Sequence, residues 1–311
     1  DFVFEDLLAG GGTSELGAQQ SAAVRAAAAL QAQLAGARSA GHVMEILANH
    51  ADEMDTLHAA TALHRLARFS SRAEREVVVF MRDPLKASLL DKLGAHGALK
   101  HLTAQGLCCT LWALARVSVA PAWLERLTEL CAEATPTFSG HQLATALHAL
   151  ARLDKLPASQ RSQTFLETLH QEVRRRQQSL GPGGTSAMDT VLIADSLTRL
   201  QVYDDEVFTA LAAALRSHLE AGELQIREVR HAATAFAGIG FVDARLSTAI
   251  CEWLRPRVSS CSAGNLVALA FALSRAGAAG PAYGRLFAAL VPEVLERLGR
   301  RDLSSRDASN L

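Results

Sequence analysis

Four arginines occupy one equivalent position in a repeated helical pattern, and their type and spacing suggest a binding chemistry. They are Arg68, Arg116, Arg152 and Arg275. Each follows a run rich in alanine and leucine and is expected to end a helix. A guanidinium carries a permanent charge and a planar fork of donors, which suits phosphate oxygens. One hypothesis is therefore a ladder of cations, spaced by the repeat, that follows a nucleic-acid backbone.

A competing interpretation of these arginines needs no ligand. A cation in the last turn of a helix complements the helix dipole and can donate to unpaired carbonyl groups. The two interpretations are compatible. Four residues before each arginine, the residue type varies between copies, and some copies place there a ring that could stack on bases. Trp112 and Phe271 are the large rings at this position, and for them a place in the core is the favoured alternative.

Further candidate RNA contacts come from the uneven distribution of charge. The net charge is only −1, yet residues 254–301 hold seven arginines against Glu293 and Glu296. The additional candidates are Arg174, Arg175, Arg176, Arg255, Arg257, Arg297, Arg300 and Arg301. The alternative for Arg174–Arg176 is an ordinary solvated helix face with local ion pairs.

Signatures of enzymes are absent from the sequence. There is no His-Glu-x-x-His, no Gly-x-Ser-x-Gly and no phosphate-binding Gly-Lys-Ser/Thr motif. Cys108 and Cys109 lie in an apolar segment, where burial raises the pKa of a thiol and favours a core role over a nucleophile. We therefore expect no catalysis, no cofactor, no metal and no small-molecule substrate.

The elements that must position the arginines are best seen in the stretch Gly140–Leu153. Leu143, Leu147 and Leu150 fall on one helical face, while alanines fill the other sides and allow close approach of neighbouring helices. Related stretches recur along the chain at intervals of roughly 34 to 50 residues, which is typical of stacked helical repeats. The composition, with 49% hydrophobic and 5% aromatic residues, also favours helices over sheets.

The predicted fold is all-α: a right-handed α-solenoid of about six two-helix repeats plus a truncated seventh. Residues 1–53 are expected to form capping helices, one from Ser14 to about Leu34 and another over Ser39–Ala51. The solenoid then covers 54–301. Its units are expected near 54–102, 103–138, 139–187, 188–227, 228–261 and 262–301.

The second helix of each unit is expected to be amphipathic. Pro121, Pro157 and Pro281 are suited to its first turn in three units. Unit 54–102 is expected to have a broken second element, because Val77–Phe80 and Pro84–Leu93 are separate apolar segments. The Gly/Pro/Ser-rich stretch Ser179–Ala187 is interpreted as a flexible insertion.

At the C-terminal end, the sequence from Ser304 to Leu311 matches that from Ser259 to Leu266, so residues 302–311 are expected to start a further repeat. The chain begins at Asp1, so a fragment or a processed form of a longer protein is expected. The five cysteines have no Cys-x-x-Cys spacing, which favours free thiols in a reducing compartment. No membrane-spanning segment is predicted.

The repeated phrases resemble those of organellar helical-repeat families, which include the octotricopeptide and heptatricopeptide repeats and the repeats of RAP-domain and FAST-kinase-like proteins. The similarity is carried by Gln142–Leu153, Thr110–Arg116, Asn265–Leu273 and His58–Arg68, and it covers about residues 40–311. No segment like a RAP domain is visible. The resemblance implies action on RNA in mitochondria or chloroplasts.

Two functions follow as hypotheses. The first is a non-catalytic RNA-binding protein of the mitochondrial matrix, or of the chloroplast as an alternative, in a large ribonucleoprotein such as the ribosome. It would contact rRNA and neighbouring proteins, and the irregular repeat lengths argue against a code of one base per repeat. The second is a protein scaffold that binds a partner helix or peptide in a concave groove.

Overall fold

The computed structural model describes residues 15–70, 83–153, 160–276 and 280–299, and every regular element within those ranges is a helix. The chain divides into two compact units, residues 1–102 and residues 103–311, which are described separately. The all-helical prediction is confirmed for the described residues, and the predicted start of a further repeat at 302–311 lies outside them.

Unit 1 is organised around α3 (Thr56–Phe69), which contacts the other helices of the unit. They are α1 (Glu15–Gly36), α2 (Ala40–His50), α5 (Pro84–Gly94) and the short 3-10 helix η1 (Ala98–His101). Both N-terminal helices were predicted. The predicted apolar segment Val77–Phe80 lies outside the described residues, whereas the one over Pro84–Leu93 is α5.

A buried histidine ties α3 to α1. His58 is 2% exposed, and its Nε2 donates to the carbonyl oxygen of Ala27 in α1 at 2.8 Å. Its Nδ1 accepts from the backbone N–H of Asp55, whose carboxylate in turn accepts from the His58 N–H at 2.9 Å. This reciprocal capping box satisfies donors that the helix start leaves free, so a polar ring is stable in the core of unit 1.

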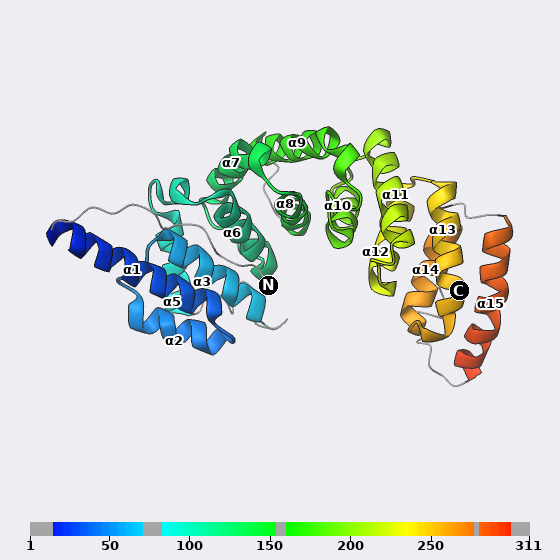
Figure 1. Cartoon of the computed structure of the whole chain (residues 1–311), viewed down its shortest axis with the longest axis horizontal. Coiled ribbons are helices and arrows are strands. Elements are labelled where there is room, and N and C mark those ends of the chain that lie inside the picture. The colour runs from blue at the N-terminus through cyan, green and yellow to red at the C-terminus, as the bar shows by residue number, and fades with distance from the viewer. Residues whose placement is uncertain (1–14, 71–82, 154–159, 277–279, 300–311) are drawn as a thin grey trace. The chain divides into compact units, whose positions relative to one another are not determined.

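Unit 2 contains two rows of helices, labelled in Figure 1. Successive members of the first row contact one another, and we call it the A row. Its members are α6 (Ala104–Val117), α8 (Gly140–Arg152), α10 (Ala187–Arg199), α12 (Ile226–Ile239) and α14 (Ala263–Arg275). Each A-row helix is followed in the chain by one helix of the second row.

The second row, the B row, shows the same neighbour-to-neighbour contact. Its members are α7 (Leu124–Ala134), α9 (Gln160–Arg175), α11 (Asp205–Glu220), α13 (Ala244–Leu254) and α15 (Pro281–Gly299). Three connections from a B-row helix to the next A-row helix contain 3-10 helices: η2 (Thr135–Thr137), η3 (Gln177–Ser179) and η4 (Arg255–Ser260). A chain that alternates between two rows in this way buries an apolar face of every helix.

The A row depends on small side chains. In α8, Leu143, Leu147 and Leu150 are at most 4% exposed, as the spacing predicts. The intervening alanines of α8 are buried as well, so both sides of the helix lie against neighbours. Because an alanine side chain is only a methyl group, the backbones of neighbouring A-row helices can approach each other closely. Thr198 of α10 thus reaches the carbonyl oxygen of Ala235 in α12 at 3.1 Å.

Local sequence fixes where these helices begin. Ser139, Ser186 and Ser262 are N-caps of A-row helices, and each hydroxyl accepts from a backbone N–H in the first turn. In the B row, Asp204 and Asp243 do the same for α11 and α13. Such caps stabilise a helix by about 1 kcal/mol each, because they satisfy donors that have no partner within the helix.

Two expectations about connections need correction or refinement. Pro281 is the first residue of α15, as predicted, but Pro121 precedes α7 by a full turn, and its carbonyl oxygen accepts from the N–H of Leu124. Pro157 lies outside the described residues. The stretch 179–187 folds back on itself: the Thr185 hydroxyl donates to the carbonyl oxygen of Ser179 at 3.1 Å.

The packing generates a prediction about stability. Replacing Leu147 by alanine leaves a cavity between α8 and its neighbours, because this side chain is 0% exposed. We expect the free energy of unfolding to fall by about 2–5 kcal/mol in urea titrations. Val242→Ala, at a side chain 57% exposed, serves as the control and should change stability by less than about 0.5 kcal/mol. Equal effects of both changes would contradict the described core.

Candidate nucleic-acid interface

The four arginines of the predicted ladder all lie in the last turn of their helices. They are Arg68 in α3, Arg116 in α6, Arg152 in α8 and Arg275 in α14. Two of them lie over a ring one turn earlier in the same helix: the guanidinium carbon of Arg116 is 5.3 Å from the centre of Trp112, and that of Arg275 is 5.8 Å from Phe271. A ring and a cation therefore recur together at the ends of these helices.

Charged side chains from three helices of the A row influence the pKa of His148. Burial lowers the pKa of His148, and the positive charges of Arg152, Arg199 and Arg116 lower it further against the opposing effect of Asp195. These side chains come from α8, α10 and α6. Arg116 and Arg152, two members of the predicted ladder, thus act on one half-buried ring.

A second histidine of the A row has a similar environment. Burial lowers the pKa of His231 in α12, and the charges of Arg230, Arg227 and Arg199 lower it as well, again against Asp195. Arg230 lies beside the ring, with 3.0 Å between its Nη2 and the His231 Nε2. Arg199 of α10 lowers the pKa of both His148 and His231, so the two groups of charges share one member.

We call this set of residues the A-row basic face. Its members are Arg116, His148, Arg152, Arg199, Arg227, Arg230 and His231. Among the charged groups that act on the two histidines, Asp195 is the acid, and it pairs with Arg199 at 3.1 Å. Five arginines and one carboxylate thus act on these two rings.

The predicted ladder is not continuous through the A row. Aligning the copies places Val202 in the turn after α10 and Phe241 in the turn after α12 at the positions that Arg152 and Arg275 hold. Phe241 is 8% exposed and packs against Phe208 at 5.8 Å. Arg275 is thus separated from Arg152 by two repeats without a column arginine. Arg68 belongs to unit 1 and is exposed there, next to His64 one turn earlier.

Sequence comparison of the copies missed Arg199, Arg227 and Arg230. These residues stand outside the repeated column, so an alignment of equivalent positions does not select them. One signal for Arg199 was available, because it lies in the last turn of α10 as the ladder arginines do in their helices. It was missed because α10 matches the other copies only loosely. The contribution of Arg227 and Arg230 depends on how α12 faces α10.

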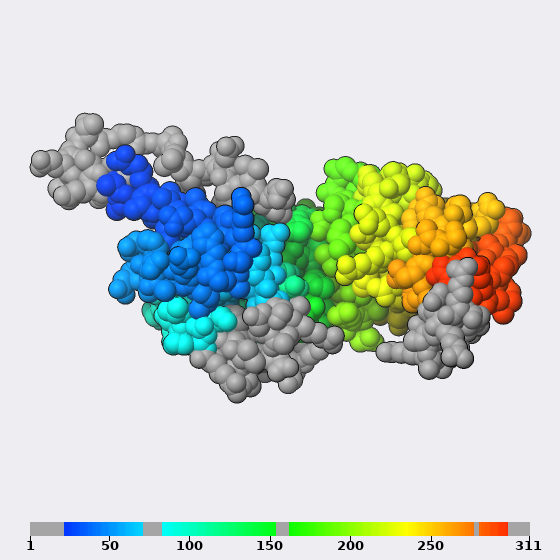
Figure 2. All heavy atoms as spheres, turned by 90° about the horizontal axis from the view of Figure 1, so that it is seen from below, coloured from blue at the N-terminus to red at the C-terminus, as the bar shows by residue number. Residues whose placement is uncertain are grey.

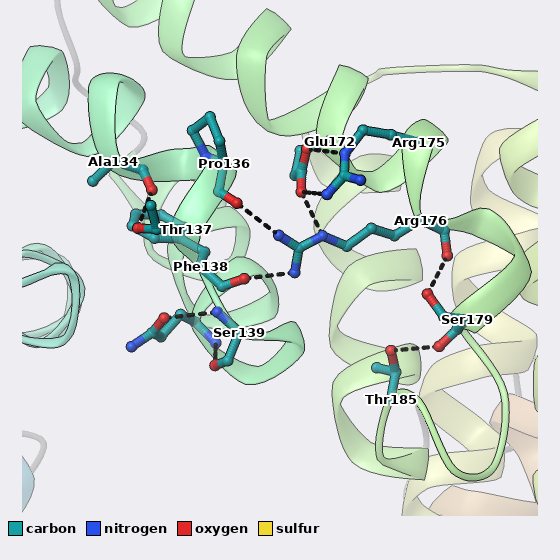
Figure 3. A network of polar contacts seen from close by, with 11 residues as sticks. Ala134, Pro136, Thr137, Phe138, Ser139, Glu172, Arg175, Arg176, Ser179 and Thr185 are labelled. Carbon is teal, nitrogen blue, oxygen red and sulfur yellow. Dashed lines mark hydrogen bonds and ion pairs between the residues drawn. The ribbon is translucent and has the colours of Figure 1, made fainter.

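The three consecutive arginines at and directly after the end of α9 all pair with other residues of the chain, although Arg174 and Arg175 stay exposed. Figure 3 shows Arg176 reaching from α9 to the segment that precedes α8, where it donates to the carbonyl oxygens of Phe138 at 2.5 Å and Pro136 at 3.3 Å. Glu172 pairs with both Arg176 and Arg175. Arg174 pairs with Glu206 of α11 at 2.6 Å. All three arginines therefore form ion pairs with glutamates of the same chain.

Arg297 repeats the arrangement of Arg176 in α15. It pairs with Glu293 one turn earlier at 2.6 Å and donates to the carbonyl oxygens of Cys261 at 2.5 Å and Ser259 at 3.0 Å. Those carbonyls directly precede α14, as those of Phe138 and Pro136 precede α8. A Glu-x-x-x-Arg pair on a B-row helix therefore fastens the start of the A-row helix of the same repeat.

Of the other arginine candidates near the C-terminal end, Arg255 pairs with Glu252 at 3.7 Å. Arg257 lies over Trp253, with 4.4 Å from its guanidinium carbon to the ring centre, and donates to the Trp253 carbonyl oxygen. Arg300 and Arg301 lie outside the described residues. Arg255 and Arg257 thus form local contacts and are not among the charges that act on His148 and His231.

Groups that could support other chemistry are few in the described part of the chain. Burial raises the pKa of the Cys108, Cys109 and Cys131 thiols, which keeps them protonated. Within residues 15–70, 83–153, 160–276 and 280–299, histidine, cysteine and carboxylate side chains form no group of three or more that could hold a metal ion. Over the same ranges, no helix has the length and apolar character that crossing a bilayer requires.

Neither a protein-family model nor a curated protein matches this chain. The functional argument therefore depends on the geometry of the chain itself.

One polar pair at the opposite, N-terminal end of the A-row helices links α8 to α10. His141 donates from Nδ1 to the Asp189 carboxylate at 2.9 Å. This hydrogen bond raises the pKa of His141. Burial alone would raise the pKa of Asp189, but the hydrogen bonds from His141 and Ser186 together hold it below its usual value.

The pair makes stability depend on pH. Because the folded-state pKa of His141 lies above 6.5, its contribution is present below pH 6.5 and is lost as the pH rises through that folded-state pKa. The contribution of Asp189 is present above pH 3.8 and is lost at lower pH. We expect His141→Gln to cost roughly 0.5–1 kcal/mol near pH 5.5, after solvent screening at a half-exposed group, and much less at pH 8.5.

Urea titrations at both pH values measure this difference. The matched control is the same substitution in an Asp189→Asn background, where it should have no pH-dependent effect. A pH-independent cost of His141→Gln in the unmodified chain would contradict the ionic character of the pair.

Proposed function

We propose that this chain is a non-catalytic α-solenoid that binds RNA through the A-row basic face. The solenoid is supported by the packing of each A-row helix on the next and of each B-row helix on the next. The observation that carries the binding function is the convergence of arginines from successive A-row helices around His148 and His231. Neighbouring repeats thus contribute cations to one surface, as a ligand with regularly spaced negative charges requires.

The chemistry of this face fits a phosphate backbone. Arginine donates in a planar fork, and the exposed Arg152, Arg199 and Arg227 can turn toward a ligand. Burial lowers the pKa of His148 and His231, and the positive charges of the arginines lower it further, so like charges lie close together in the free protein. A polyanion placed over the face relieves that repulsion, which makes binding favourable without any base-specific contact.

The ring and guanidinium pairs add a second mode of contact. Trp112 with Arg116 and Phe271 with Arg275 each present a flat surface next to a cation, and Phe271 is 46% exposed. Stacking of a base on such a pair tolerates any sequence, since every base has a flat face. Binding of this kind fits a protein that binds folded RNA such as rRNA better than one that recognises a defined base sequence.

The cellular setting of the proposal rests on the resemblance of the repeats to organellar helical-repeat proteins. By that resemblance the chain acts in the mitochondrial matrix, within a ribonucleoprotein such as the ribosome, beside other proteins of the complex. A chloroplast particle is the corresponding setting in a plant or alga.

Salt dependence tests the electrostatic basis of binding. We expect the triple variant Arg116→Gln, Arg152→Gln, Arg199→Gln to bind unstructured and folded RNA more weakly, because it removes three cations from the face. The slope of log K against log salt concentration should shrink by about 2, since each phosphate contact in a single strand contributes about 0.7. Filter binding or fluorescence anisotropy from 50 to 300 mM salt measures this slope.

A matched control removes the same net charge from the B row. Arg126→Gln, Arg216→Gln, Arg245→Gln alters α7, α11 and α13 and should leave the slope within about 0.5 of the parent value. Equal losses in both triple variants would mean that binding follows net charge alone and would refute the proposed face. If the chain binds a peptide or protein with an affinity that neither triple variant nor the salt concentration changes, the scaffold hypothesis is favoured instead.

Proton uptake provides an independent test. The pKa values of His148 and His231 are lowered in the free protein, so both rings are neutral near pH 7. A bound phosphate raises these pKa values, so binding takes up protons and affinity increases as the pH falls from 7.5 to 5.5. Isothermal titration calorimetry in buffers of different ionisation enthalpy measures the uptake.

The control for proton uptake is the double variant His148→Asn, His231→Asn, which keeps a polar side chain at both positions. We expect it to bind with reduced proton uptake and a flatter pH dependence. If the double variant takes up as many protons as the parent chain, the RNA does not lie over these histidines.

A further inference from the structure

Two repeats of unit 2 hold an arginine side chain at the start of their A-row helix, and the carbonyl groups that bind it occupy fixed positions. Arg176 of α9 donates to the carbonyl oxygens one and three residues before Ser139, the N-cap of α8 (Figure 3). Arg297 of α15 donates to those one and three residues before Ser262, the N-cap of α14. We call each arrangement an arginine clamp. The start of an A-row helix thus provides acceptors for one guanidinium.

The repeat formed by α10 and α11 has the same acceptor positions but lacks the arginine. Figures 1 and 2 show α11 in light green and α15 in orange to red, so the two helices belong to different repeats. With α9, they align without a gap at their buried apolar positions, which are Phe165, Leu169, Val207, Leu211, Leu286 and Leu290. In this alignment, His218 of α11 corresponds to Arg176 and Arg297, and Ala214 corresponds to the glutamates that pair with them.

An open pocket of about 520 Å³ lies beside His218, where the other two repeats hold a guanidinium. Its lining consists of residues 182–188, His218 and Glu223. The residues one and three positions before Ser186, the N-cap of α10, are Thr185 and Gly183. In the part of the chain that the structure describes, no hydrogen bond ends on the carbonyl oxygen of either residue. The acceptors that the clamps use in two repeats are therefore unused here.

A carboxylate is held at the edge of this pocket. His218 is 0% exposed, and its Nδ1 donates to Oε2 of Glu223 at 2.6 Å. Its Nε2 lies 3.4 Å from the hydroxyl oxygen of Thr190, which stands where α8 and α14 have Leu143 and Leu266. The Glu223 side chain is 48% exposed. The buried histidine thus orients a carboxylate that a ligand can reach.

The loop that forms the pocket wall has a shape fixed by its own contacts. The backbone N–H groups of Gly184 and Thr185 both donate to the carbonyl oxygen of Gly181, at 3.0 and 3.1 Å. A methyl group on Gly184 would lie only 2.1 Å from the carbonyl oxygen of Ser179, so this position requires glycine. A preformed wall reduces the entropy that binding costs.

We propose that this pocket binds the arginine side chain of a partner protein. Carboxylate and carbonyl oxygens only accept hydrogen bonds, and a guanidinium only donates them, in a planar fork. Pro182, Ala187 and Met188 add apolar surface for the methylene stem of the arginine. The partner's arginine would complete between two proteins the clamp that α9 and α15 form within one chain.

The proposed site is separate from the A-row basic face. It lies at the first residues of α10, whereas Arg199 lies in the last turn of the same helix. A rise of 1.5 Å per residue puts these two ends roughly 20 Å apart. The site therefore adds a protein contact to the proposed binding of RNA and does not depend on it.

A peptide titration of the whole chain tests the proposal. The probe is the blocked pentapeptide acetyl-Gly-Ala-Arg-Ala-Gly-amide, and nuclear magnetic resonance follows the backbone amides of Gly183, Gly184 and Thr185. We expect saturable shifts of these amides. The same peptide with citrulline, which has the shape of arginine but no charge, should bind at least about tenfold more weakly. A lysine peptide should bind several-fold more weakly, because an ammonium lacks the planar fork.

Matched variants locate the binding. Glu223→Gln removes the carboxylate and should weaken binding of the arginine peptide at least about fivefold. Glu220→Gln removes the same charge from a side chain of α11 that is 69% exposed, and should change the affinity less than about twofold. The double variant Ala214→Glu, His218→Arg rebuilds an arginine clamp within the chain. It should keep the helical signal in circular dichroism and lose peptide binding.

Four results would overturn the proposal. One is equal binding of the arginine and citrulline peptides. Another is an equal loss of affinity in Glu223→Gln and Glu220→Gln, and a third is a folded double variant that binds like the parent chain. The fourth is a shift of the same three amides by inorganic phosphate, which would identify an anion site. None of these measurements involves RNA, so their failure and that of the proposed function are distinguishable.

Discussion

Direct contact between small-faced helices is the constraint on which unit 2 depends. The A-row helices meet through alanines such as Ala144, Ala146 and Ala149, each 0% exposed, and Gly238 of α12 lies close enough to Thr198 that a methyl group there would be crowded at 3.0 Å. Helices this close have no room between them for a charged side chain. The arginines and histidines of the A row are consequently displaced to the edges and ends of the helices, where charges from successive repeats come together.

The tight packing also explains how the connections between helices are held. A segment that enters an A-row helix leaves carbonyl groups without a partner, and burial of such groups is costly. Arg176 and Arg297 supply donors to these carbonyls from the neighbouring B-row helix, each with a glutamate one turn earlier that balances its charge. These two arginines therefore stabilise the fold, which their place in the sequence does not reveal.

Although the net charge is near zero, the charged residues are distributed differently in the two rows. Acids on the B-row side, such as Glu172, Glu206, Glu252 and Glu293, neutralise neighbouring arginines in local pairs. On the A-row basic face, Asp195 opposes several cations and is engaged by Arg199. The two rows thus differ in how their arginines are paired, which a net charge of −1 cannot reveal.

The sequence by itself determined the helices, because capping residues and the spacing of leucines are local signals. Ser139 with Gln142 and the stripe of Leu143, Leu147 and Leu150 are sufficient to predict α8. It also placed four arginines at helix ends, since that position repeats along the chain. Only the tertiary structure decided which arginines share a surface. Arg199, Arg227 and Arg230 meet the histidines because α10 and α12 pack side by side, whereas Arg176 turns inward to unpaired carbonyls, and neither outcome is encoded by spacing within one helix.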